Sequence, residues 1–297
     1  MRQFATPEAF KQALEQRLLA DANLRGQDVN RLRQLLIFDR FLARIFASSG
    51  EWLLKGGLAL GLRTPKARTT RDVDLRTLGD PHQILSRLQQ AMLIDLGDHL
   101  SFEVGLDRDS PTIEGAGALY GGRRFRVLPT LAGRVYAAPF GVDVVIGGPV
   151  IGEVDLATGK LSLVFAGIQP GQMRIVPVEQ HIAEKLHALT LPRPTANSRV
   201  RDLPDLLLLG GLGRLTAQQI GSAVEATFAF RATHSVPASL PPLPSTWADK
   251  YAKITREIDL PWPTLVEAAG AARVFLEPVL AGVSGIWEGK TWRWGMG

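Results

Sequence analysis

Residues 53–76 read LLKGGLALGLRTPKARTTRDVDLR, and the predicted fold is built outward from this stretch. Residues 51–54 predict a short strand, two glycines lead into a helix at 56–63, and a basic loop precedes a second strand at 71–77. On that strand Asp72 and Asp74 flank a single valine. Because strand side chains alternate, both carboxylates should leave one face while Val73 and Leu75 enter the core. This order suggests phosphate chemistry.

The segments on either side predict an α+β protein. Helices are expected from Thr6 to about Ala22, between Gly26 and Ser48, and from Asp80 onward. Residues 123–129, 133–138 and 142–146 predict strands, with weaker strands to about residue 175. Beyond Pro177 the pattern is helical with no clear strand. We therefore expect a mixed-sheet domain with N-terminal helices at 1–176 and an α-helical domain at 177–297.

Composition narrows the class of protein. In 297 residues, 45% are hydrophobic and 21% charged, no apolar run is long enough to span a membrane, and there is no cysteine. A membrane protein, a disulfide framework and a thiolate metal site are excluded, and the N-terminus lacks a signal-peptide pattern, so a cytoplasmic protein is expected. The net charge of +5 fits a polyanionic partner or simply a basic enzyme.

Three acids form the predicted metal site. Asp72 and Asp74 would repel each other without a cation, and carboxylates with no neighbouring histidine or cysteine favour Mg²⁺ or Mn²⁺. Asp143, inside the apolar strand FGVDVVI, is the candidate third ligand, although a strand-edge aspartate facing water is the alternative. A second Asp-x-Asp, at Asp107 and Asp109, precedes Ser-Pro and predicts only a solvated turn.

The glycines and one lysine could bind phosphate. Gly56 and Gly57 stand at a strand-to-helix turn, where backbone amides and the helix dipole attract an anion. Lys185 lies on the inward stripe of a helix, so it either pairs with an anion or extends to solvent. Asp202 precedes a proline in the first turn of the next helix, and helix capping is its simplest role.

Two other groups of residues predict structure rather than chemistry. His181 and His187 are too far around one helix to form a metal pair, so both are interpreted as structural. The C-terminal tryptophans beside cationic residues could stack on bases, but core packing is the preferred interpretation.

The ordered set of motifs resembles the AbiEii/AbiGii family of nucleotidyltransferase-like toxins, which includes the MenT toxins and belongs to the polymerase β superfamily. The set consists of Lys55-Gly56-Gly57, Arg68-Thr-Thr-Arg-Asp72-Val-Asp74, Glu184-Lys185 and Arg199-x-Arg-Asp202-x-x-Asp205. The resemblance spans about residues 53–209 and extends to the closing Trp287-x4-Trp292-Arg-Trp294. It implies a polymerase-β-like sheet domain.

The resemblance also implies roles for individual residues. Metal would be bound by Asp72, Asp74 and Asp143, and Lys185 and Asp202 would be needed for catalysis. The NTP would be held by Lys55, Gly56, Gly57, Thr70 and Arg71. This chain departs from the superfamily's serine after the first glycine, which is Gly57 here. It also has Thr70 where close relatives have serine, which leaves a regulatory phosphorylation there open, and Arg201 where the family usually has lysine.

The implied function is that of a bacterial toxin with a cognate antitoxin, which transfers a nucleoside monophosphate from an NTP to the tRNA acceptor end and stops translation. A small-molecule nucleotidyltransferase of the antibiotic-modifying kind is the first alternative. A non-catalytic GTP- or RNA-binding protein is the second. The active site is expected in the cleft between the sheet domain and the helical domain.

Overall fold

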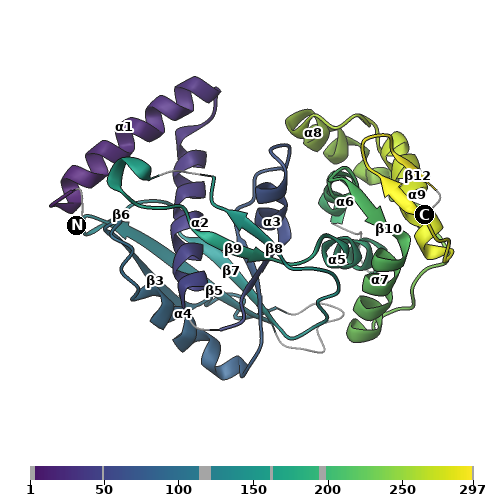
Figure 1. Cartoon of the computed structure of the whole chain (residues 1–297), viewed down its shortest axis with the longest axis horizontal. Helices are drawn as coiled ribbons and strands as arrows, with labels where there is room; N and C mark the ends of the chain where they lie inside the picture. Colours follow the sequence, from purple (N-terminus) through teal and green to yellow (C-terminus); the bar gives the residue numbers. More distant parts are fainter. Residues whose placement is uncertain (1–3, 49, 114–121, 161–162, 194–198, 296–297) are drawn as a thin grey trace.

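The computed structural model describes residues 4–48, 50–113, 122–160, 163–193 and 199–295 (Figure 1). A large mixed sheet with its own helices is followed by a mainly helical C-terminal part. Within the described ranges, none of the helices has the length and apolar character needed to traverse a lipid bilayer.

The helices begin where the sequence provides a cap. Thr6 accepts a hydrogen bond from the Ala9 amide at the start of α1, and Asp28 accepts one from the Arg31 amide at the start of α2. The described helices are α1 (Pro7–Arg25), α2 (Val29–Ala47), α3 (Gly56–Arg63), α4 (Ile84–Met92), α5 (Val178–Thr190), α6 (Asp202–Gly210), α7 (Ala217–Arg231), α8 (Ala248–Ile258) and α9 (Leu265–Leu280).

The large sheet has the order β3-β5-β7-β2-β1-β9-β8, with β4 and β6 also paired to β5. It is mixed, because β2 runs parallel to β7 and β1 parallel to β9, while the other pairs are antiparallel. Its strands are β1 (Leu53–Lys55), β2 (Val73–Thr77), β3 (Leu100–Leu106), β4 (Thr112–Ile113), β5 (Gly122–Leu131), β6 (Arg134–Val135), β7 (Phe140–Ile146), β8 (Asp155–Thr158) and β9 (Gln172–Ile175).

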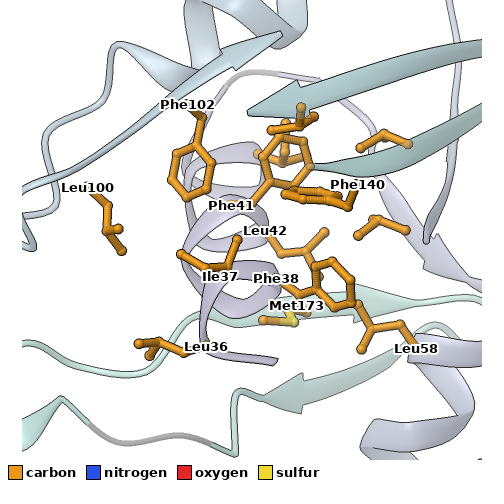
Figure 2. Close-up of a cluster of buried hydrophobic side chains, with 14 of the residues drawn as sticks. Leu36, Ile37, Phe38, Phe41, Leu42, Leu58, Leu100, Phe102, Phe140 and Met173 are labelled. Atoms are coloured by element: carbon orange, nitrogen blue, oxygen red, sulfur yellow. The ribbon is translucent and has the colours of Figure 1, made fainter. Parts of the chain in front are cut away.

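The N-terminal core lies between α2 and one face of the sheet. Figure 2 shows Phe38 and Phe41 of α2 close to Phe140 of β7, and the ring centroids of Phe41 and Phe140 are 5.4 Å apart. Val73 and Leu75 of β2 are fully buried in the same cluster, as the alternation of the Asp72–Leu75 segment predicts. Asp74 of β2 and Asp143 of β7, which alternate with these buried residues, therefore point to the other face.

A second hydrophobic cluster fills the C-terminal part. It gathers buried residues from α5, α6, α7, α8 and α9, together with Leu60 of α3 and Ala67 of the following loop. In Figure 1, α3 lies between the sheet and these helices. Leu60 and Ala67 belong to this second cluster, whereas Leu58 and Ala59 belong to the first, so the segment between β1 and β2 packs on both cores. The predicted domain boundary at residues 176/177 stays a prediction.

The C-terminal tryptophans pack in the core, which confirms that interpretation. Trp287 is completely buried, donates from its indole nitrogen to the Gly210 carbonyl at 2.7 Å, and contacts Phe275 and Trp294. Trp287 also belongs to a small sheet of β10 (Arg214–Thr216), β11 (Ile286–Glu288) and β12 (Arg293–Gly295). The expectation of no strand beyond Pro177 is therefore wrong, because three-residue strands are too short to show an alternating pattern.

Most predicted elements of the N-terminal half match the structure, although the two-residue strand β4 was not predicted and β2 and β3 also differ. β2 begins at Val73, so Asp72 lies just before the strand and is exposed. The edge strand β3 was not predicted, although its buried residues Leu100, Phe102 and Val104 alternate with less buried ones. The second Asp-x-Asp forms the predicted turn, because Asp107 accepts hydrogen bonds from the amides of Asp109 and Ser110.

Candidate active site at the glycine turn and the acidic strand

Two parallel strands bring the predicted carboxylates together. Asp74 of β2 stands opposite Asp143 of β7 in the ladder, so both side chains leave the face that α2 does not cover. Asp72 reaches across to β7, where its Oδ1 lies 2.9 Å from the position that a Cβ on Gly141 would take. A side chain at position 141 would displace Asp72, so this glycine allows the three acids to share one face.

The glycine turn lies against the same acids. Gly56 has a φ of +66°, which favours glycine, and a Cβ there would lie 1.9 Å from Oδ2 of Asp74. Lys55 occupies the N-cap position of α3 and provides no side-chain cap. The first amides of α3 therefore lack a side-chain acceptor from the cap residue and lie beside Asp74, which suits an anion bridged by a cation to the carboxylates.

The charge at this face favours a cation. Burial raises the pKa of Asp74 to about 6, and the carboxylates of Asp143 and Asp72 act in the same direction, while Lys55 and Lys185 oppose them. A divalent cation beside these carboxylates would offset both their burial and their mutual repulsion. The carboxylates of Asp72 and Asp74 therefore fit Mg²⁺ or Mn²⁺ by chemistry.

Asp143 has a partner that the sequence analysis did not predict. Arg124 of β5 donates to both of its oxygens, from Nε at 2.7 Å and from a terminal nitrogen at 2.8 Å. Among the described residues, no three aspartate, glutamate, histidine or cysteine side chains are grouped closely enough to hold a metal ion. Both carboxylate oxygens of Asp143 therefore already accept hydrogen bonds from an internal cation. The alternation of Arg124 and Arg126 with Phe125 and Val127 was a readable signal for an outward-facing arginine.

Lys185 lies in an ionic cluster formed with two acids of α6. Its Nζ is 2.7 Å from Asp202 and 2.8 Å from Asp205, and Arg68 donates to both oxygens of Asp205 at 3.1 Å. We name these four residues the junction cluster, because Arg68 belongs to the loop between α3 and β2 while the others belong to α5 and α6. The inward lysine therefore pairs with anions instead of extending to solvent.

The capping role preferred for Asp202 is wrong. Asp202 is the first residue of α6, Arg201 occupies the cap position, and no side chain caps the helix. The ammonium of Lys185 attracts the carboxylate more strongly than backbone amides do, because the pair is largely buried. Asp205 was quoted in the motif without a role, and it is the residue that joins Lys185 to Arg68.

The remaining predicted phosphate ligands differ in whether they already have a partner within the protein. Lys55 is paired with Glu184 of α5 at 2.7 Å, which ties β1 to the C-terminal helices, whereas Arg71 is exposed. Thr70 donates to the Asp72 carbonyl at 3.2 Å, and its Oγ1 would lie 3.1 Å from a Cβ at Gly57. The Thr70 hydroxyl therefore fills space that the superfamily's serine would need at position 57.

A cavity of about 210 Å³ adjoins this turn on the side of α2. Gly57, Arg68 and Thr70 line it from the turn and the loop, and Phe38 and Met173 contribute apolar surface. The three carboxylates and Lys185 are not among the residues that line it.

The two histidines of α5 are structural, as interpreted. His181 and His187 are almost completely buried, and burial lowers the pKa of each to about 3, so both are neutral near pH 7. His187 contacts Thr233 at 2.8 Å and the Phe228 ring, which joins α5 to α7.

Comparison with known proteins shows the family. Residues 40–270, well over half of the chain, match the family model described as nucleotidyl transferase AbiEii toxin, type IV toxin–antitoxin system. No curated protein matches the chain. Among solved structures, MenT4, a nucleotidyltransferase toxin from Mycobacterium tuberculosis, is similar with a TM-score of 0.49 and 14% identity, over 90% of this chain and 88% of that one. JHP933 from Helicobacter pylori is similar with a TM-score of 0.44 and 16% identity, over 84% of this chain and 93% of that one. The family match and the mixed sheet with its acidic face lead to one conclusion: this chain belongs to the AbiEii nucleotidyl transferase toxin family.

Proposed function

We propose that this nucleotidyltransferase moves a nucleoside monophosphate from an NTP to the 3′-hydroxyl of a tRNA acceptor end and so inhibits translation. The observation that carries the proposal is the gathering of Asp72, Asp74 and Asp143 on one sheet face against the Gly56 turn. Nucleotidyl transfer needs carboxylates for a divalent cation beside a binding site for the leaving phosphates, and the acids beside the glycine turn support the proposal on both counts.

In the proposed reaction the acceptor oxygen bonds to the α-phosphorus, the bond from that phosphorus to the bridging oxygen breaks, and pyrophosphate leaves. A bound Mg²⁺ or Mn²⁺ would polarise the α-phosphate and neutralise charge that develops on the leaving oxygen. Asp72 and Asp74 would hold this cation, and Asp143 would join them after release from Arg124. The first amides of α3, at Gly56 and Gly57, would bind the departing phosphates.

The basic residues near the site differ in how many of their N–H donors would be available to these phosphates. Arg71 is exposed next to Asp72 and is the readiest to bind them. An ammonium has three N–H donors, and Lys185 directs two toward Asp202 and Asp205, which leaves one for a phosphate oxygen. Asp202 would act on catalysis by holding Lys185 in place, and Lys55 by positioning the turn through Glu184.

The proposed setting is the bacterial cytoplasm, with an antitoxin as the regulatory partner. The family description supports a toxin–antitoxin pair. The tRNA acceptor is supported by the net charge of +5, since polyanions bind basic proteins through phosphate contacts that added salt weakens.

The test is to incubate the purified protein with labelled NTPs, Mg²⁺ and total tRNA. We expect labelled tRNA and pyrophosphate from the wild type and neither from Asp72→Ala, with Asp109→Ala of the second Asp-x-Asp as the matched control that keeps activity. Labelling that survives Asp72→Ala contradicts the proposal. Pyrophosphate release that requires a small-molecule acceptor favours the antibiotic-modifying class, and nucleotide binding with no pyrophosphate release favours a non-catalytic protein.

A further inference from the structure

The pair between Arg124 and Asp143 involves one of the three carboxylates that are proposed to bind the metal. Its two hydrogen bonds, at 2.7 and 2.8 Å, use both oxygens of Asp143, in the parallel geometry that an arginine fork makes with a carboxylate. The two residues stand opposite each other in the register of β5 and β7, so the sheet itself holds them in contact. The Arg124 side chain is nevertheless 40% exposed.

This pair competes with a metal ion. A guanidinium within hydrogen-bond distance of both oxygens puts a full positive charge where a divalent cation at Asp143 would be repelled. Asp74, directly across the ladder, makes no such fork with any described residue, and the cations that act on it are those of Lys55 and Lys185. The three carboxylates of this face therefore differ: Asp143 is paired with an arginine in a two-bond fork, whereas Asp72 and Asp74 are not.

The exposure of Arg124 decides between a permanent and an exchangeable contact. Ion pairs that are open to solvent contribute little to stability, because water solvates the separated charges. Opening this pair leaves the guanidinium in water and leaves Asp143, whose side chain is 19% exposed, beside two other acids. An unpaired Asp143 carboxylate beside two other acids is unfavourable unless another cation binds there. Opening of the pair is therefore coupled to cation binding.

We propose that Arg124 is an exchangeable internal counter-ion, which holds Asp143 until a divalent cation displaces it and completes the carboxylate site. The inference rests on the proposed function, since it assigns Asp143 to the metal. Arg124 is thus a positioning residue that sets the affinity of the site for the metal. Once displaced, its guanidinium remains on the strand next to the acids, where a substrate phosphate is a suitable new partner.

The experiment measures Mn²⁺ binding to the full chain, without nucleotide, by electron paramagnetic resonance of the free ion. Arg124→Gln removes the competing charge, and we expect Mn²⁺ to bind at least about tenfold more tightly than to the wild type. Arg134→Gln is the control, because Arg134 of β6 pairs with Leu131 at the other end of β5, and its effect should stay below about threefold. Arg124→Lys keeps the charge without the fork and should give an intermediate affinity.

The outcomes separate this inference from the proposed function. If Asp143→Asn weakens Mn²⁺ binding while Arg124→Gln and Arg124→Lys leave the affinity at the wild-type value, Asp143 binds metal but Arg124 does not compete, and the inference is wrong. If Asp74→Asn binds Mn²⁺ as the wild type does, the proposed metal site itself is wrong. Should Arg124→Gln fail to fold, as judged by its circular dichroism melt, Arg124→Lys carries the test, and an affinity equal to that of the wild type overturns the inference.

Discussion

The protein contains two clusters of buried charged side chains that look alike and hold different things together. In the first, which we name the α2 cluster, Asp98 accepts hydrogen bonds from Arg40 at 2.8 Å and from Arg44 at 2.6 and 3.0 Å. The second is the junction cluster around Lys185 and Asp205. Each places carboxylates between cationic side chains at hydrogen-bond distance.

The surroundings of the two clusters differ. Asp98, Arg40 and Arg44 are at most 2% exposed, and Arg44 also donates to the Leu100 carbonyl, which fixes α2 to the start of β3. In the junction cluster Lys185 and Arg68 keep side-chain exposures of 13% and 16% and connect α5 and α6 to the loop before β2. The two clusters are therefore alike in their ion pairs, and they differ in solvent access and in the loop that the junction cluster holds.

Asp98→Ala should have the largest effect on stability. It leaves two buried guanidinium groups without their carboxylate, and such a loss costs about 3–5 kcal/mol in the free energy of unfolding. Guanidinium-chloride denaturation followed by circular dichroism measures it. Asp109→Ala, in an exposed turn, serves as the control, and a loss for Asp98→Ala no greater than that of the control would show that the α2 cluster is dispensable.

Lys185→Met should destabilise the protein less and abolish nucleotidyl transfer. It leaves Asp202 and Asp205 without the ammonium, but Arg68 still neutralises Asp205, so we expect a cost of about 2–3 kcal/mol. The same denaturation curves and the tRNA-labelling assay measure the two effects. The matched control is Lys253→Met at an exposed position of α8. Full activity in a folded Lys185→Met protein would place the junction cluster with the structural one.

Asp39→Asn should stabilise the protein at alkaline pH. Asp39 lies beside the α2 cluster, 3.5 Å from Arg40, yet neither carboxylate oxygen accepts a hydrogen bond from the described residues. Burial raises the pKa of Asp39 to about 6, above the value of about 3.9 expected in the unfolded chain. The ionised form therefore costs stability above pH 6, and this cost disappears as the pH falls from 6 toward 4.

The measurement is the free energy of unfolding as a function of pH. At pH 8 we expect Asp39→Asn to exceed the wild type by about 1–2 kcal/mol, with the difference shrinking toward pH 4. A variant that is less stable than the wild type at pH 8 would mean that the carboxylate of Asp39 is needed in its ionised form.

Lys66→Ala should have the smallest effect. Its Nζ lies 3.2 Å from Asp259, so it crosses the same junction as Arg68, but the two side chains are 52% and 94% exposed. The free energy of unfolding should change by no more than about 0.5 kcal/mol. Thermal melts of Lys66→Ala and Lys185→Met should be compared. A small loss for Lys66→Ala would show that a contact across the junction stabilises the protein only when it is buried, and a loss as large as that of Lys185→Met would contradict this.

Local pattern predicted much of the N-terminal region. The strand, glycine turn, helix, basic loop and acidic strand between Leu53 and Thr77 appear in the predicted order, because each depends on residues that are near in sequence. Thr6 caps its helix as expected. Strands β3 and β4 and the three short strands of the C-terminal sheet were missed, because short edge strands are stabilised mainly by the partners they pair with.

The partners of charged residues could not be predicted in the same way. Asp202 could cap its own helix or pair with a distant cation, and only the packing of α5 on α6 brings Lys185 within 2.7 Å of it. The pair between Arg124 and Asp143 depends on the register of β5 against β7. Neither register nor helix packing is encoded in a local pattern of residue types.

The sequence by itself determined which residues carry charge, where the acidic strand and glycine turn lie, and which side chains alternate into the core, because these depend on covalent order and backbone periodicity. Only the tertiary structure decided which charges are already neutralised. Electrostatic energy depends on distance and burial, and both are set by strands and helices that meet from far apart in the chain. For that reason the three acids could be named from the sequence, whereas the pairing of Arg124 with Asp143 could not.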